Sequence, residues 1–212
     1  MNVFLWNQKE QHVNSRDLLK RAVLQYEALK QNTDEYRESP KDSLFEFTAE
    51  ELGIRELPGG KPCVVDRNGD RLPVECSVTH TGDWWLCTVG SHPSGLDAEL
   101  RSRAVNPALI RRIGTEDERE WLDRAAELRP EDQNERLLWL WVRKEAYVKY
   151  LGTGIKEGFN TFSVFEVAAK GADGESCSFQ TVDLGEISDE AAEQLHVAVY
   201  CREEIESVEW LK

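Results

Sequence analysis

The sequence predicts an α+β protein with two similar lobes, each a helix packed on a small antiparallel sheet. Three observations lead to this fold class. Stretches with apolar residues at helical spacing alternate with groups of short apolar or alternating runs, which are typical of strands. The runs in each group are separated by short turn sequences, so successive strands are expected to be antiparallel. Each half of the chain also repeats the order of helix followed by three strands.

In the first half, a helix is expected from Ser15, as its cap, to about Lys30, because apolar residues recur there every three or four positions. Residues 31–42 are polar and are interpreted as a loop, and 48–52 as a short helix. A turn with two glycines at 59–60 separates this part from the strands. The strands expected in this half cover residues 3–6, 62–65, 74–80, 84–89 and 95–100.

In the second half, residues 107–128 are expected to be helical, 129–133 to form a polar link, and a second helix to run to Leu151. Gly152 and Gly154 end it, since glycine readily adopts the left-handed conformation that closes helices. The strands expected after it cover residues 159–167, 177–184, 195–201 and 207–211. We place the boundary between an N-terminal lobe, 1–102, and a C-terminal lobe, 103–212, in the link after the first set of strands.

The amino-acid composition limits which kinds of partner the protein is expected to bind. The 212 residues carry a formal net charge of -14. Neither nucleic acid nor an anionic membrane surface is therefore expected as a partner, because both require a basic footprint. The five cysteines show no metal-ligand spacing and are expected to be buried, reduced thiols. With no apolar leader and no run of membrane-spanning length, the sequence indicates a cytoplasmic protein.

The helix expected to end at Leu151 places two charged residues on its apolar face. Glu145 and Lys149 fall at the centre of the stripe that Leu138 and Val142 make apolar, while Arg143 and Lys144 take the polar side. An unpaired buried charge is costly, so a helix meant only for packing would keep both residues off this stripe. The simpler interpretation is a solvated Glu-Lys pair four residues apart.

A second acidic cluster favours the functional interpretation. Asp97 and Glu99 lie two residues apart in a strand, so both side chains point to the same face. Together with Glu145 they would provide three carboxylates with open positions, a set suited to Mg²⁺ and substrate phosphates. Lys149 would then meet phosphate oxygens. Thr79 and His80, at a strand-to-turn corner, and Lys61, between Gly60 and Pro62, are further candidates for holding a diphosphate.

These motifs together resemble the 4'-phosphopantetheinyl transferase superfamily. The resemblance is carried by Gly-Leu-Asp-Ala-Glu at 95–99, by Trp-Val-Arg-Lys-Glu-Ala-Tyr-Val-Lys at 141–149, and by Gly-Thr-Gly at 152–154. The sequences Gly-Lys-Pro at 60–62 and Ser-Val-Thr-His-Thr-Gly-Asp-Trp at 77–84 are similar to the monomeric, surfactin-synthetase-activating (Sfp) type. So is Ile-Arg-Arg-Ile at 110–113, followed by Glu118 and Trp121.

The resemblance implies that coenzyme A binds in the cleft between two pseudo-symmetric lobes of a monomer. A serine of an apo acyl or peptidyl carrier protein would attack the β-phosphate, and 3',5'-ADP would leave. By match to the family motifs, three groups of residues receive roles. Mg²⁺, or alternatively Mn²⁺, would be held by Asp97, Glu99 and Glu145. Glu145 or a metal-bound water would take the serine proton, and Lys149 would neutralise developing charge. Coenzyme A would be bound by Lys61, Pro62, Thr79, His80, Lys149 and Arg16.

Arg16 is predicted to contact the 3'-phosphate of coenzyme A, because the basic cluster that this type uses for that phosphate is not recognisable in the N-terminal segment. Carrier proteins are usually acidic, so we expect one to dock on the basic cluster of Arg101, Arg103, Arg111 and Arg112. Three other functions stay open. They are a catalytically silent relative that binds coenzyme A or a carrier protein, a Mg²⁺-dependent phosphohydrolase, and a plain interaction module. Fatty-acid, polyketide and peptide-synthetase carriers are not distinguished.

Overall fold

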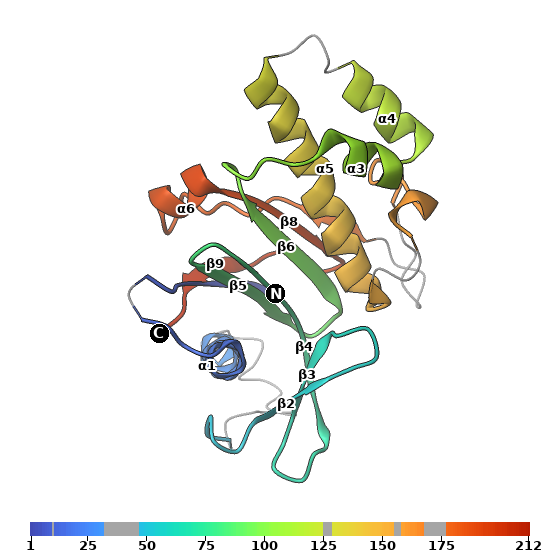
Figure 1. The fold of residues 1–212 in the computed structure, drawn as a ribbon. Helices are drawn as coiled ribbons and strands as arrows, with labels where there is room; N and C mark the ends of the chain where they lie inside the picture. The colour runs from blue at the N-terminus through green and yellow to red at the C-terminus, as the bar shows by residue number, and fades with distance from the viewer. Residues whose placement is uncertain (10, 32–46, 125–128, 155–157, 168–176) are drawn as a thin grey trace.

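Two β-sheets lie face to face, and helices cover the outer face of each sheet (Figure 1). The computed structural model describes residues 1–9, 11–31, 47–124, 129–154, 158–167 and 177–212. In chain order, the elements used below are β1 (Asn2–Asn7), α1 (Ser15–Lys30), β2 (Gly53–Glu56), β3 (Pro62–Val65), β4 (Arg71–Thr81), β5 (Trp84–Gly90), β6 (Ser94–Leu100), α3 (Pro107–Ile113), α4 (Glu116–Asp123), α5 (Pro130–Leu151), the 3₁₀ turn η2 (Phe159–Thr161), β7 (Ser178–Gln180), α6 (Asp189–Gln194), β8 (Leu195–Cys201) and β9 (Ser207–Trp210).

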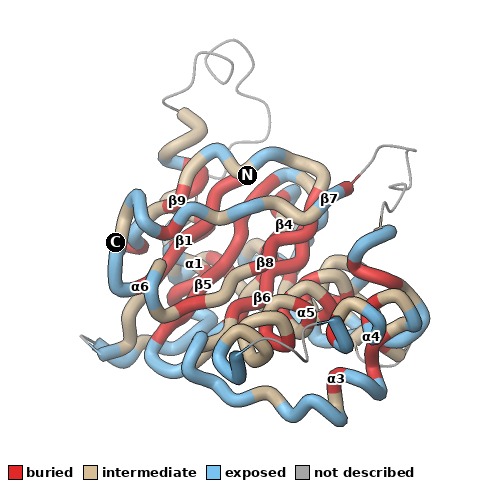
Figure 2. The backbone as a smooth tube through the Cα atoms, turned by 90° about the horizontal axis from the view of Figure 1, so that it is seen from above, coloured by how far each residue is buried: buried red, intermediate tan, exposed pale blue. Residues whose placement is uncertain are grey.

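The larger sheet has the strand order β2-β3-β4-β5-β1-β9, and the smaller sheet has the order β6-β8-β7. The last strand of the chain, β9, pairs in parallel with the first, β1, so both termini belong to the larger sheet. The strands at the centre of the molecule are its most buried part, as Figure 2 shows for β1, β5, β6 and β8. Val3 and Leu5 from one sheet pack there against Leu96 and Val199 from the other.

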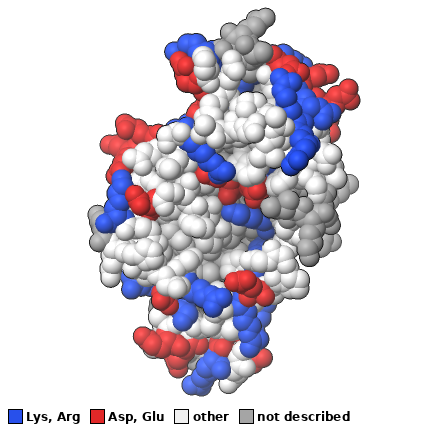
Figure 3. Space-filling model, viewed as in Figure 1, with Lys and Arg blue, Asp and Glu red and all other residues white. Residues whose placement is uncertain are grey.

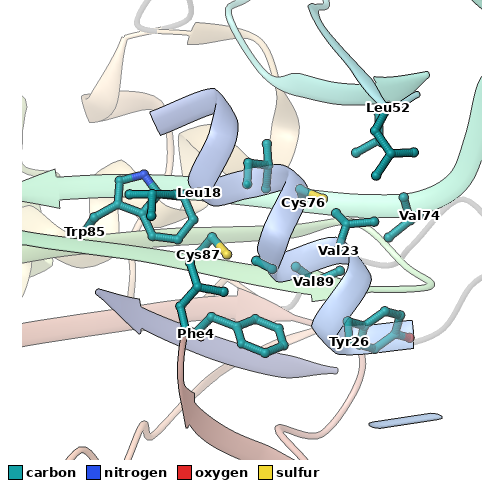
Figure 4. Close-up of a cluster of buried hydrophobic side chains, with 14 residues drawn as sticks. Phe4, Leu18, Val23, Tyr26, Leu52, Val74, Cys76, Trp85, Cys87 and Val89 are labelled. Atoms are coloured by element: carbon teal, nitrogen blue, oxygen red, sulfur yellow. The ribbon is translucent and has the colours of Figure 1, made fainter. Parts of the chain in front are cut away.

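Helix α1 covers the outer face of the larger sheet. Its apolar stripe, which includes Leu18, Val23 and Tyr26, packs against Phe4 and Trp85 (Figure 4). The helix is capped by Asn14, whose side chain accepts a hydrogen bond from the Arg16 amide. The cap is therefore one residue earlier than Ser15, which instead accepts a hydrogen bond from the Trp85 indole at 2.8 Å.

Helix α5 covers the outer face of the smaller sheet, and it approaches β6 very closely. A Cβ atom on Gly95 would lie 1.8 Å from the backbone oxygen of Ala146, so a side chain at that position is excluded. Helices α3 and α4 pack on the other side of α5, around Ile110, Leu122 and Leu140. Helix α5 therefore packs against the smaller sheet on one side and against α3 and α4 on the other.

The α+β class is confirmed, together with α1, β1, β3, β4, β5, β8 and β9, at nearly the predicted bounds. The expected meander is wrong at its third strand. After Pro93 the chain crosses to the smaller sheet, where β6 pairs along its length with β8. Strand β6 of the first half pairs with β8, and β9 of the second half pairs with β1, so each sheet contains strands from both halves. The division into two lobes at residue 102 stays a prediction. Residues 32–42 of the expected loop lie outside the described residues.

Three further assignments are corrected. The helix expected at 107–128 is broken, because Gly114 is extended and Thr115 begins a new helix with a capping box to Glu118; residues 125–128 are outside the described part. The polar link at 129–133 is instead the first turn of α5, where Pro130 suits the first helical position. Residues 48–52 form a turn, in which the Glu51 side chain accepts hydrogen bonds from Thr48.

The strand expected at 159–167 is also wrong, because its backbone groups are bound by side chains rather than by a neighbouring strand. The Val164 amide donates to Glu118, and the Phe159 carbonyl accepts from Lys144. Of the strand expected at 177–184, only β7 forms. Two elements, β2 and α6, were not predicted.

Candidate active site

A cavity of about 220 Å³ lies where the turn between β2 and β3 meets β4 and the C-terminal end of α5. It combines the backbone of four glycines with three charged side chains. The lining residues are Gly59, Gly60, Lys61, Pro62, Ser77, Val78, Glu145, Val148, Lys149, Gly152 and Gly154. Glu145 and Lys149, which the sequence singled out on α5, therefore share one cavity with Lys61 and Pro62.

Lys149 connects α5 to the smaller sheet. Its ammonium group lies 2.8 Å from Oδ1 of Asp97 and donates to the Val78 carbonyl at 3.3 Å. Asp97 is 6% exposed, and its Oδ1 also accepts a hydrogen bond from the Thr79 hydroxyl at 3.0 Å. Its second oxygen, Oδ2, is buried and has no hydrogen-bond partner. A carboxylate oxygen left bare in this way is costly unless a cation or donor meets it.

The pKa values of Asp97 and Glu145 are both raised, and the charge of Asp97 opposes the ionisation of Glu145. Burial raises the pKa of Asp97, and the charge and hydrogen bond of Lys149 act against that rise. Burial also raises the pKa of Glu145, and the negative charge of Asp97 raises it further. Ionised together, the two carboxylates favour a cation between them.

Glu99 points to the same face of β6 but is already engaged. It accepts a hydrogen bond from the Thr81 hydroxyl at 3.0 Å and forms an ion pair with Arg103. Among the residues that the structure describes, no three His, Cys, Asp or Glu side chains form a group that could hold a metal. Asp97 presents an unpartnered carboxylate oxygen and Glu145 lines the cavity, which are features that a cation could use. The metal ligand set of Asp97, Glu99 and Glu145 stays a prediction.

The other predicted coenzyme A contacts fall in different places. Lys61 lines the cavity, donates to the Ser94 carbonyl at 3.2 Å, and has a pKa that burial lowers. Thr79 is buried and supports Asp97 instead of facing the cavity. His80 is exposed and does not line the cavity. Arg16 is also exposed, and it pairs with Glu56 at 3.4 Å.

Lys144 is a residue whose importance the sequence did not reveal. Although placed on the polar side of its helix, its side chain is fully buried and lies 2.6 Å from Oε2 of Glu118, which is also fully buried. The ammonium group further donates to the carbonyls of Phe159 and Phe162. The pair thus joins α4, α5 and the segment after η2 directly beside Glu145. The Thr-x-x-Glu capping box at 115–118 was the available signal.

The predicted docking cluster is mostly neutralised. Arg101 pairs with Glu135, Arg103 with Glu99, and Arg111 with Asp123. Arg112 is exposed. The face of the molecule drawn in Figure 3 shows acidic and basic side chains intermixed. In the described part of the chain, no helix is both long and apolar enough to cross a membrane.

A cavity lined by Lys61, Glu145 and Lys149, with Asp97 paired to Lys149, is suited to an anionic substrate and is carried on an α+β fold. Comparison with known families agrees with this class. The model of the 4'-phosphopantetheinyl transferase superfamily matches residues 93–201, and the chain belongs to that superfamily. The matched region contains Asp97, Glu99, Glu145 and Lys149, while Lys61 lies before it.

Curated relatives are of the Sfp-like type. The chain is 30% identical to 4'-phosphopantetheinyl transferase Sfp of Bacillus subtilis over 106 residues, which is 50% of this chain and 43% of the relative. It is 27% identical to 4'-phosphopantetheinyl transferase gsp of Aneurinibacillus migulanus over 113 residues, or 53% of this chain and 44% of the relative. The matches therefore span about half the length of these relatives.

Proposed function

We propose that this protein transfers the 4'-phosphopantetheine group of coenzyme A to a serine of an apo acyl or peptidyl carrier protein, releasing 3',5'-ADP. Membership of the superfamily supports the reaction class. The observation that carries the proposal is that Lys149, which lines one cavity together with Glu145, pairs with the buried Asp97, whose second carboxylate oxygen is bare. The protein is proposed to work as a monomer in the cytoplasm.

Coenzyme A is proposed to bind with its charged end in the cavity. Lys61 and Pro62 on one wall would receive the 3'-phosphoadenosine end, and Lys149 on the other would meet the diphosphate. Lys61 suits an anion, because its burial disfavours the charged ammonium until a negative group arrives. Thr79 would act indirectly, by holding Asp97, and Arg16 and His80 stay predicted contacts at the exposed edge.

In the transfer step, the carrier serine Oγ forms a bond to the β-phosphorus as the bond from that phosphorus to the bridging oxygen breaks. The electron pair leaves with 3',5'-ADP, and Lys149 stabilises the charge that develops on the diphosphate oxygens. Glu145 is proposed to accept the serine proton. Its raised pKa makes it a stronger base than an ordinary glutamate, which suits proton transfer near neutral pH.

A divalent cation, Mg²⁺ or alternatively Mn²⁺, is proposed to be held by Asp97 and Glu145, with Glu99 as the third predicted ligand. It would neutralise diphosphate charge and polarise the phosphoryl group. Glu99 can take this part only if its contacts with Arg103 or Thr81 open.

The test is intact-mass measurement on a panel of apo carrier proteins incubated with this protein, coenzyme A and Mg²⁺. A gain of one phosphopantetheine on at least one carrier is expected, and it should disappear with EDTA and with Glu145→Gln. Lys20→Gln, on the first helix and away from the cavity, serves as the matched control and should transfer normally. No gain on any carrier, with coenzyme A still bound in a calorimeter, would instead favour the catalytically silent relative.

A further inference from the structure

A second cavity, of about 280 Å³, lies on the smaller sheet away from the candidate active site. It exists because β7 pairs with β8 only through Gln180, opposite Val199. Beyond that point, residues 181–184 separate from the edge of β8. The cavity is lined by Arg101, Arg143, Gln180, Thr181, Val182, Asp183, Leu184, Ala192, Leu195, His196 and Val197. None of these residues lines the cavity that holds Glu145 and Lys149.

Arg143 is the unusual member of this lining. It is half-buried, and its guanidinium lies 3.8 Å from the centre of the Trp139 ring and 5.6 Å from that of Phe179. Its hydrogen bond to the Trp139 carbonyl is long, at 3.4 Å. Among the described residues, no carboxylate lies within ion-pair distance of it, although acids outnumber bases 40 to 26 in the sequence.

Stacking on the Trp139 ring bears on how the Arg143 guanidinium could bind a ligand. An aromatic ring occupies the flat face of a guanidinium, while the N–H donors point outward in its plane. Those donors match the geometry of a phosphate or carboxylate, which they bind in pairs. The Trp139 ring thus covers a face of the Arg143 guanidinium and leaves in-plane donors that an oxyanion could use.

Two further basic groups stand beside Arg143 and share a single carboxylate. Arg101 and His196 both pair with Glu135, His196 at 2.7 Å, and Arg101 lies 3.4 Å from the His196 ring. Glu135 itself is not part of the lining. The acid in the lining is Asp183, which is exposed and accepts a hydrogen bond from the Gly185 amide at 3.0 Å.

We propose that this second cavity is a binding site for a small oxyanion with at least two negative charges, of the phosphate or diphosphate class. Arg143 would hold the oxyanion, together with Arg101, whose guanidinium would be shared between Glu135 and the ligand. The site is separate from the transfer site, and the proposal does not depend on the proposed function. Asp183 would repel such a ligand, so the proposal predicts that removing the charge of Asp183 strengthens binding.

The test is calorimetric titration of inorganic pyrophosphate into the full-length protein at fixed ionic strength. Arg143→Gln and Arg101→Gln should each weaken one binding event by at least about tenfold, because each removes a charge-assisted hydrogen bond. Asp183→Asn should strengthen the same event by roughly twofold or more, because it removes a like charge at the rim while keeping the acceptor for Gly185. Lys149→Met identifies any pyrophosphate that binds in the first cavity.

The outcomes separate the possibilities. Binding that survives in Lys149→Met and fails in both arginine variants supports the proposal. Binding that disappears in Lys149→Met, or that is the same in wild type and Arg101→Gln, overturns it. Arg101→Gln is the decisive variant if Arg143→Gln unfolds, since the Arg101 side chain is more exposed and is not stacked.

Discussion

The contact between Gly59 and Gly152 offers a sharp test of how the first cavity is built. Gly59 belongs to the turn between β2 and β3, and Gly152 caps α5; both line the cavity. A Cβ atom on Gly59 would lie 1.9 Å from the Gly152 carbonyl oxygen, whereas real Cβ contacts essentially never fall below 3.0 Å. Gly60 is a matched control. Its φ of 88° is close to the 99° of Gly59, but a Cβ there meets nothing within 4 Å.

The expected magnitudes follow from this difference. Alanine at either position must adopt a positive φ, at a cost of about 1–2 kcal/mol. Gly59→Ala must in addition displace the turn from α5 by about 1 Å, and overpacking of this kind costs about 1–3 kcal/mol more. The displaced turn also carries Lys61, so Gly59→Ala should weaken coenzyme A binding more than Gly60→Ala does.

Urea unfolding of the two variants measures the free-energy difference, and calorimetry with coenzyme A measures the binding difference. The comparison is between variants, so the shared cost of the positive φ cancels. Equal unfolding free energies for Gly59→Ala and Gly60→Ala would refute the reasoning, because they would mean that the turn does not rest on the end of α5.

Two other variants test the charges around the site. Glu145→Gln should abolish transfer yet raise the free energy of unfolding at pH 7 by about 0.5–2 kcal/mol, since it removes a charge that burial and Asp97 make unfavourable. Because the folded-state pKa of Glu145 is raised, its ionisation costs stability as pH rises from the unfolded to the folded value; the gain should therefore vanish in urea unfolding below pH 4.5. Lys144→Met should cost about 3–5 kcal/mol by leaving Glu118 charged and buried, whereas Lys144→Met with Glu118→Gln should cost less; equal losses would contradict a charge effect.

The elements that could be predicted from the sequence are those with local causes. Helix α1 and strands β4 and β5 follow from the spacing of their own apolar residues. The segment 159–167 could not be predicted in this way, because its backbone partners are the side chains of Glu118 and Lys144, distant in the sequence. The transfer of β6 to the second sheet has a similar cause, since a short turn specifies a reversal but not which strand is paired afterwards.

The same distinction holds for the site. The prediction that Glu145 and Lys149 share one functional place rests on helical spacing, and both do line the first cavity. Thr79 and His80 were grouped because they are neighbours, but adjacent residues of a strand point to opposite faces. Ser77, Thr79 and Thr81 form the polar face of β4, and their hydroxyls bind the Leu96 amide, Asp97 and Glu99. The alternation of residues along this strand predicts that polar face better than sequence adjacency does.

The basic residues of α5 show why a polar side in a sequence does not mean a solvated side. Lys144 lies opposite the apolar stripe, yet α4 and the segment after η2 cover it, and Glu118 supplies its charge partner. Lys149 likewise has Asp97. Arg143 lacks such a carboxylate among the described residues, in a chain where acids are in excess. A half-buried guanidinium without a carboxylate partner leaves its charge uncompensated, and this is the physical reason for assigning it a ligand from outside the chain.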